Sequence, residues 1–355
     1  MFVFRKIRYL LASVLLLIIS ASTGCEYISS ITDVSPSPSS IAESTTTAAS
    51  TTTTEQFVFP EKPVYTPEAG TFKPSEEESE IYQYMLDLIN EDRQNAGLSP
   101  VTMGSNAAAL SHAQDMFDNY FVAHWGTNGL KPYIRYTISG GLNYEMENSA
   151  YTGWYDPAED ESKYGDLDIK QALYDLQYAM MNDDGPTWGH RNNIINKYHD
   201  KVNMGIVYDD KRLALVQQFE GNFIEYFEPP SISGSTLTIG GSILEGKLKS
   251  VNICFDELPV PLTPDELLNG PYHSYSLGGR VGYVVSPPPP GQYYSSLSPE
   301  AVVADLWETN DRGQFMISAD ISETLAQGKG VYTIVIYADC GEETVQITNY
   351  SISIE

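Results

Sequence analysis

Two histidines and one acid are the residues of this sequence best suited to chemistry. His124 ends the segment NYFVAH, Glu147 lies in YEMENSAY, and His190 lies in WGHRNNIIN. Imidazoles and a carboxylate that meet in one cleft can bind a divalent metal, act as acid and base, or hydrogen-bond one another. The function therefore depends on whether and how these three side chains converge.

Three kinds of site are compatible with this residue set. Two neutral imidazoles at about 2.0 to 2.1 Å can hold zinc or a similar divalent ion, while carboxylates orient the histidines or act as bases. Without metal, a carboxylate raises the pKa of a neighbouring histidine and forms an acid-base pair with it. The third interpretation is a hydrogen-bonded polar cluster that stabilises the fold.

No nucleophile accompanies these residues in the sequence. There is no GxSxG or HExxH motif, and neither Cys254 nor Cys340 is near the three in sequence. We assign no catalytic role to His112 or His273, and a structural or surface role to His199.

The N-terminus predicts export. Residues 1–24 form a signal peptide, with three basic residues, an apolar run and then small residues before Cys25. The apolar run is about half of the roughly 20 residues that span a bilayer, so we do not interpret it as a permanent transmembrane helix. The small residues before Cys25 are typical of a bacterial lipoprotein cleavage site, which predicts lipidation of Cys25. The alternative is ordinary cleavage of the signal peptide, followed by secretion without a lipid anchor.

Composition excludes some partners. The formal net charge of −27 would repel nucleic acid and anionic lipid, so we expect no nucleic-acid partner and membrane contact through the lipid anchor only. Residues 25–72 are rich in Ser, Thr and Pro and have few large apolar side chains, which is typical of a flexible linker.

The elements that must position the three residues lie within residues 73–227. Helical periodicity and a capping box formed by Ser75 and Glu78 predict three helices, and two strand-like runs separated by a polar turn predict a hairpin. These elements cover residues 75–97, 105–120, 169–180, 202–210 and 212–221. Helices followed by strands indicate one α+β layered domain.

Residues 228–355 show a different pattern. Short alternating segments with turn residues between them predict an all-β, immunoglobulin-like sandwich of seven or eight strands. Pro287 to Pro290 must lie in a connection, because proline cannot donate to a sheet ladder. In an oxidising compartment Cys254 and Cys340 could form a disulfide, if their side chains meet.

The segments LINEDRQNAGLSPV, HAQDMFDNYFVAHWG, MENSAY, WGHRNNIIN and VNMGIVYDD, in this order, resemble the CAP superfamily of SCP-like extracellular proteins, in its bacterial branch. The resemblance implies an α-β-α sandwich, secretion, and a cleft lined by two histidines and two acids. By position, His124, Glu147 and His190 match three of these residues. Family members often carry a glutamate as the second acid, and here Asp183 or Asp184 would replace it with a shorter side chain.

The resemblance implies no single reaction. We expect an exported cell-surface lipoprotein whose cleft binds a lipid, glycan or peptide ligand of the cell wall or extracellular space, or a divalent metal such as zinc, and we favour binding over catalysis. One alternative is a metal-assisted hydrolase of peptides or cell-wall glycans. The other is a structural or adhesive surface protein with an inert cluster.

Overall fold

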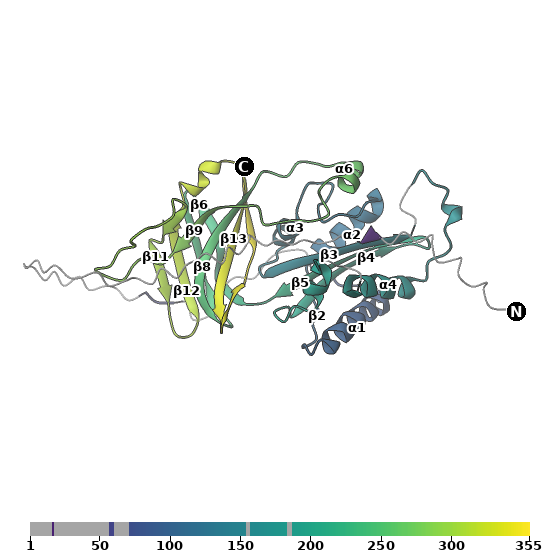
Figure 1. The fold of residues 1–355 in the computed structure, drawn as a ribbon, viewed down its shortest axis with the longest axis horizontal. Helices are drawn as coiled ribbons and strands as arrows, with labels where there is room; N and C mark the ends of the chain where they lie inside the picture. The colour runs from purple at the N-terminus through teal and green to yellow at the C-terminus, as the bar shows by residue number, and fades with distance from the viewer. Residues whose placement is uncertain (1–15, 18–56, 60–70, 154–156, 183–186) are drawn as a thin grey trace, which may run out of the picture.

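The computed structural model describes residues 16–17, 57–59, 71–153, 157–182 and 187–355. An α-β-α layered half and a β-sandwich lie end to end (Figure 1), as the predicted fold class requires. Cys25, Asp183 and Asp184 lie outside the described residues, as do most of the predicted signal peptide and linker. Among the described residues, no helix is both long and apolar enough to cross a bilayer.

The layered half is built around one sheet with the strand order β1-β3-β5-β4-β2. Strands β3, β5 and β4 are antiparallel neighbours, while β2 runs parallel to β4. The strands are β1 (Leu16–Leu17), β2 (Thr102–Met103), β3 (Tyr144–Gly153), β4 (Lys201–Tyr208) and β5 (Arg212–Gly221). The helices are α1 (Ser79–Asn95), α2 (Ala108–Asn119), α3 (Pro132–Ile138), the 3-10 helix η1 (Glu161–Lys163), α4 (Ile169–Asn182) and α5 (Gly189–Ile194).

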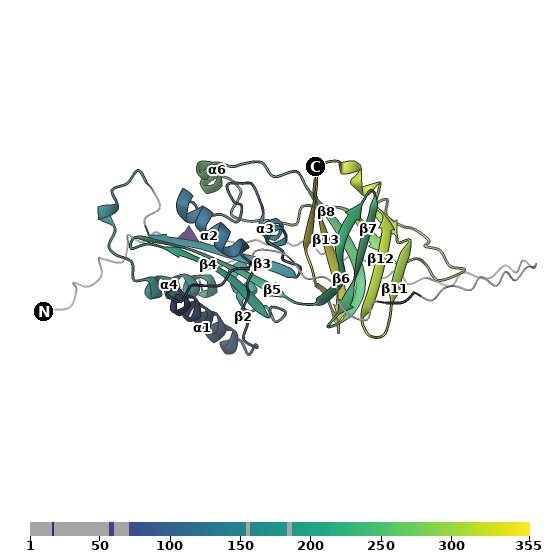
Figure 2. The same cartoon turned by 180° about the vertical axis from the view of Figure 1, so that it is seen from behind.

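Alternation along β5 explains why helices cover both faces of this sheet. Leu213, Leu215 and Phe219 pack in one core with α1 and α4, whereas Ala214 and Val216 pack in a second core with α2. Successive side chains of a strand point to opposite faces, so an apolar strand needs cover on both sides. Figure 2 shows α1 and α4 on one side of the sheet and α2 and α3 on the other.

The predicted elements of this half are confirmed. Ser75 and Glu78 exchange the hydrogen bonds of a capping box just before α1, and Gly97 follows α1 with a φ of +75°. The hairpin is β4 and β5. The pattern did not reveal α3 or β3, and β3 is the strand that carries Glu147.

The second half is a β-sandwich of a six-stranded and a four-stranded sheet. Its strands are β6 (Ile224–Ser233), β7 (Thr236–Ile243), β8 (Lys247–Asp256), β9 (Gly279–Val285), β10 (Ala301–Val303), β11 (Leu306–Thr309), β12 (Gln314–Asp320), β13 (Gly330–Cys340), β14 (Glu343–Gln346) and β15 (Tyr350–Ile354). The short helices are α6 (Pro264–Asn269) and η2 (Thr324–Gln327). The described residues thus contain more strands than the seven or eight predicted, because short edge strands such as β10 and β14 carry little alternation.

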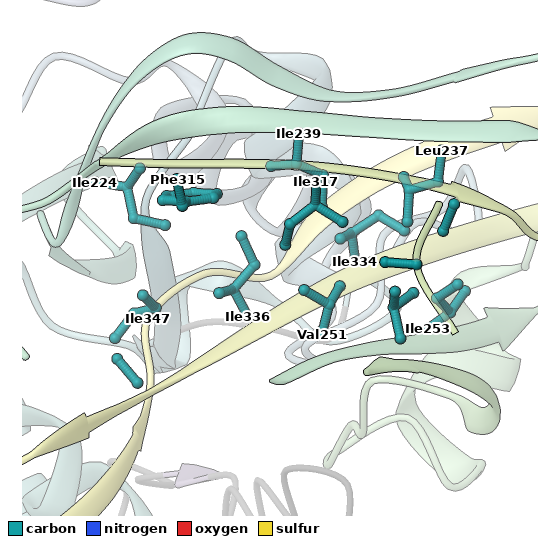
Figure 3. Packing of buried hydrophobic residues seen from close by; sticks show 14 of the residues in the cluster. Ile224, Leu237, Ile239, Val251, Ile253, Phe315, Ile317, Ile334, Ile336 and Ile347 are labelled. Carbon is teal, nitrogen blue, oxygen red and sulfur yellow. The ribbon is translucent and has the colours of Figure 1, made fainter. Parts of the chain in front are cut away.

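Branched apolar side chains from both sheets meet between them (Figure 3). Ile239 and Ile317 from the four-stranded sheet face Val251 and Ile336 from the six-stranded sheet, and all four are fully buried. Pro287 to Pro290 lie between β9 and β10, in a connection as predicted.

Cys254 and Cys340 do not form the disulfide that the sequence left possible. Cys254 of β8 pairs with Thr333 of β13, and Cys340 lies seven residues further along β13. At about 3.3 Å per residue this separation is roughly 23 Å, far beyond disulfide reach.

One segment of the second half leaves the sandwich and runs over the layered half. Residues 257–278 connect β8 to β9 and contain α6; we call this segment the strap. Leu267 of α6 is fully buried in the core formed by α2 and β5. A separate small core joins Tyr133 and Ile134 of α3 to Val331 and Val335 of β13. The two halves therefore share buried surface.

Candidate functional site

The structure brings His124 and Glu147 into direct contact. The loop after α2 presents His124, β3 presents Glu147, and α5 presents His190 near its beginning. His124 Nδ1 lies 3.1 Å from Glu147 Oε1. His190 is close enough to affect the pKa of His124, which is lowered by burial, raised again by Glu147 and lowered further by His190.

These three residues are sealed in the interior. His124, Glu147 and His190 each have 0% exposed surface. The sequence predicted an open cleft, whereas the structure has a closed cluster. Any function of this cluster must be compatible with its complete burial.

Two further residues of the cluster were missed from the sequence. Arg135 of α3 donates from Nη2 to Glu147 Oε2 over 2.8 Å and from Nη1 to the His124 carbonyl over 2.9 Å. His112 of α2 donates from Nε2 to the Ala123 carbonyl and lies 3.9 Å from Glu147 Oε1. The only available signal was a lone arginine in the apolar segment PYIRYTI, which alone does not identify a partner.

The charges of the cluster form one buried pair. Burial raises the pKa of Glu147, but Arg135 and the imidazoles of His112 and His124 outweigh it and lower that pKa to about 2. Burial and the charge of Arg135 lower the pKa of His112 to about 4. Near neutral pH, Glu147 is therefore ionised beside the Arg135 guanidinium, while His112 and His124 are neutral.

The same contacts determine the proton positions. A carboxylate only accepts, so the His124 Nδ1–H donates to Glu147 and the Nε2 of His124 carries the lone pair. No described residue hydrogen-bonds to this Nε2. An imidazole oriented in this way by a carboxylate is the arrangement found in metal-ligand and general-base histidines.

The described residues do not fit a complete metal centre. They contain no group of three His, Cys, Asp or Glu side chains that could hold an ion, and the two predicted aspartates lie outside them. Glu147 gives one oxygen to His124 and the other to Arg135, whose positive charge opposes a cation at the same carboxylate. Of the ligands predicted from the sequence, the imidazoles of His124 and His190 remain.

The strap closes the cluster from outside. The backbone N–H of His124 donates to the Tyr272 carbonyl over 3.0 Å, and the backbone N–H of Glu147 donates to the Tyr275 hydroxyl over 2.9 Å. The Tyr275 ring stands edge-on to the His124 ring with 5.0 Å between centroids. The strap thus satisfies backbone donors of both site residues and covers them with an aromatic ring.

A network of amide side chains positions α5 on the other side of β3. Asn148 donates to the His190 carbonyl over 3.2 Å and to Gln217, and Gln217 donates to Gln177 of α4 over 2.8 Å. Asn193 of α5 donates to Asn148 over 2.8 Å. These buried groups have partners and constrain the backbone around His190.

A second buried acid, Glu145, also escaped the sequence. It lies two residues before Glu147 on the same face of β3 and has no exposed surface. Burial and then the charge of Glu147 raise the pKa of Glu145 well above its usual range. The buried Glu145 carboxyl therefore favours its neutral form far more than an exposed glutamate does.

Part of the layered half matches a known protein family. Residues 86–219 match the family model of CAP, the Cysteine-rich secretory protein family. Among solved structures, the chain is similar to an outer surface protein from Borrelia burgdorferi, at 16% identity and a TM-score of 0.28, over 43% of this chain and 99% of that chain. That likeness is too weak to support a functional argument. A comparison with curated proteins gave no match. Residues 86–219 of the layered half are therefore a CAP domain, and a C-terminal β-sandwich follows it.

Proposed function

We propose that the protein is displayed at the cell surface through a lipid on Cys25 and that its CAP domain is non-catalytic. The residue pattern before Cys25 and the composition of residues 25–72 support the anchor and the linker. In this proposal, the cluster around Glu147 joins the strap to the CAP domain. Ligands are then bound away from this buried cluster.

One observation supports a non-catalytic role: His124, Glu147 and His190 have no exposed surface. The backbone N–H groups of His124 and Glu147 also donate hydrogen bonds to the strap. A general base or nucleophile must come within hydrogen-bond reach of its substrate. Here the carboxylate is already bound by Arg135 and His124, and the Tyr275 ring packs edge-on against His124. Such a cluster specifies how the strap docks.

Chemical modification tests this closure. Diethyl pyrocarbonate acylates accessible neutral imidazoles, and peptide mass spectrometry locates the products. In the folded protein we expect His124 and His190 to stay unmodified, while the same reagent in urea modifies them. Rapid modification of either residue in the folded protein would contradict the proposal.

A metal-assisted hydrolase of peptides or cell-wall glycans is the second candidate. It is favoured by one observation, the Nε2 of His124, which no described residue binds and which Glu147 orients through Nδ1. The discriminating assay is turnover of purified wall and peptide substrates, with and without added zinc, by wild type and His124→Gln. Cleavage by the wild type that is lost in a variant of equal melting temperature would establish the hydrolase. Equal, background-level cleavage supports the closed cluster.

A further inference from the structure

A pocket lies where the CAP domain meets the sandwich, apart from the closed cluster. Its volume is about 440 Å³. Its walls come from the loop after β2, the end of α3 with the loop that follows, the start of β4, the end of β5 and the start of β6. It is thus formed by both halves, and its size lies within the range of small-molecule sites.

Glu220 is the most constrained polar residue of this pocket. Only 6% of it is exposed. Asn143 donates to one carboxylate oxygen over 2.8 Å, and Asn203 donates to the other. Both oxygens thus accept amide N–H groups, and because a carboxylate offers about four acceptor sites, Glu220 keeps acceptor sites for a further donor. Burial and then the charge of Glu220 raise the pKa of Tyr136, a neighbour in the same wall.

No cationic side chain of the described residues forms an ion pair with Glu220. Lys201 stands directly opposite Glu220 in the pairing of β4 with β5 and lines the same pocket, yet no ion pair within 4.0 Å joins the two. A second carboxylate, Glu225, is exposed on the pocket wall.

Apolar side chains complete the wall. Met103, Leu142 and Ile224 line the pocket together with Glu220 and Tyr226. An occupant therefore meets an apolar surface as well as a carboxylate. A slender aliphatic chain that ends in a positive charge has this combination of properties.

We propose that this pocket binds a primary alkylammonium group, such as a lysine side chain or an aliphatic diamine. The ammonium group donates to Glu220, Glu225 adds long-range attraction, and the alkyl stem lies against Met103, Leu142 and Ile224. The net charge of −27 attracts cations to this protein in general, and the pocket supplies a specific partner for one. Lys201 opposes the ligand as a like charge.

Calorimetric titration of the full mature chain at low salt tests the proposal. The probes are cadaverine, Nα-acetyl-lysine amide and the uncharged analogue Nα-acetyl-norleucine amide. We expect saturable binding of one molecule of either cation, with a Kd on the order of 1 mM, and affinity at least about tenfold weaker for the norleucine probe. Binding of cadaverine but not of the lysine amide would identify a free diamine as the source, and similar binding of both would favour any exposed lysine-type amine.

Three variants locate the binding. Glu220→Gln should weaken the cation at least about tenfold, because a charged hydrogen bond is lost. Glu225→Gln, at an exposed position, should weaken it about twofold without affecting folding, and Lys201→Gln should strengthen it about twofold. Circular dichroism and melting temperature verify the fold of each variant.

Several results would overturn the proposal. These are no saturable cation binding, equal binding of the norleucine probe, or unchanged affinity in folded Glu220→Gln. If Glu220→Gln does not fold, the opposite effects of Glu225→Gln and Lys201→Gln decide, and no effect from either overturns it. None of these results bears on the His124 cluster, whose closure is tested separately.

Discussion

Arg135 holds Glu147 in a buried ion pair. Its guanidinium lies 2.8 Å from the carboxylate, and both side chains are almost fully buried. A buried charge that loses its partner destabilises a protein far more than a broken surface pair does. The pair thus gives Glu147 a structural role in the folded protein.

Arg135→Met should therefore lower the free energy of unfolding by about 3 to 5 kcal/mol, because Glu147 remains buried without its cation. Urea denaturation followed by circular dichroism measures this change. Arg280→Met is the matched control, since Arg280 pairs with Glu300 on the surface, and it should cost less than about 1 kcal/mol. Equal effects from both variants would show that the buried pair is not a stabilising contact.

His199 gives the protein a pH-dependent stability. Its ring stacks on Phe219 at an interplanar angle of 12°, and its Nδ1–H donates to the Asn193 carbonyl over 2.9 Å. Burial lowers its pKa to about 3. Because the unfolded chain has a histidine pKa near 6.5, the unfolded state binds an extra proton between about pH 6.5 and 3.

The His199 contribution to stability is therefore fully present above about pH 6.5 and is lost as the pH falls toward 3, by up to about 1.4 kcal/mol per pH unit. Glu145, with its raised pKa, contributes with the opposite sign, so the wild-type slope is a sum. The measurement is the unfolding free energy of wild type and His199→Phe from pH 7 to 4. The variant should lose stability less steeply as the pH falls, and the two proteins should have the same slope near pH 7. Identical slopes below pH 6 would refute the assignment.

At the scale of elements, the strap contacts both His124 and Glu147. It contacts the loop after α2 closely, since a Cβ on Gly129 would lie 2.1 Å from the Val260 carbonyl oxygen. Gly129 also has a φ of +75°, which favours glycine. The Leu262 N–H donates to the Thr127 carbonyl over 2.8 Å beside this contact. Only a glycine lets strap and loop approach in this way.

Gly129→Ala should push the strap away from the CAP domain. Hydrogen exchange should accelerate at the amides of Leu262, which donates from the strap, and His124, which donates to it. Gly97→Ala is the control: Gly97 has the same φ of +75°, but a Cβ added there would have no atom within 4 Å, so the change should cost about 1 kcal/mol and leave those two amides protected. Unchanged exchange in Gly129→Ala would show that the strap does not depend on this approach.

At the scale of the whole molecule, the two halves are joined by buried polar contacts as well as by apolar packing. Asp256, the last residue of β8, accepts from Lys131 and from the Tyr133 hydroxyl, each over 2.5 Å. The side chain of Asn349 in the sandwich exchanges hydrogen bonds with the backbone of Glu145 in β3. Such an interface couples the unfolding of one half to that of the other.

We expect calorimetry to show a single unfolding transition for the two halves together. Asp256→Asn should lower the unfolding free energy by about 3 kcal/mol, because Lys131 would keep no carboxylate partner. Asp339→Asn, which removes an exposed pair with Lys249, should change it by less than about 1 kcal/mol. Two separate transitions in the wild type would mean that the halves unfold independently.

Local patterns in the sequence determined much of the architecture. The capping box at Ser75, the apolar spacing of α1, α2 and α4, and the paired runs of β4 and β5 depend on neighbours within one element, so periodicity alone predicted them. The alternation after residue 228 predicted the sandwich for the same reason. The order of the motifs then predicted that His124 and Glu147 meet, and His124 Nδ1 lies 3.1 Å from Glu147 Oε1.

Only the tertiary structure decided whether that contact is reachable. Burial of Glu147 depends on Arg135 from α3 and Tyr275 from the strap, which are 12 and 128 positions away in sequence. Neither lies in a repeating pattern that points to Glu147, and the strap crosses from the other half of the molecule. The periodicity of a segment predicts which of its own side chains are buried. The accessibility of a site depends instead on which distant segment packs over it, and that is a property of the folded chain.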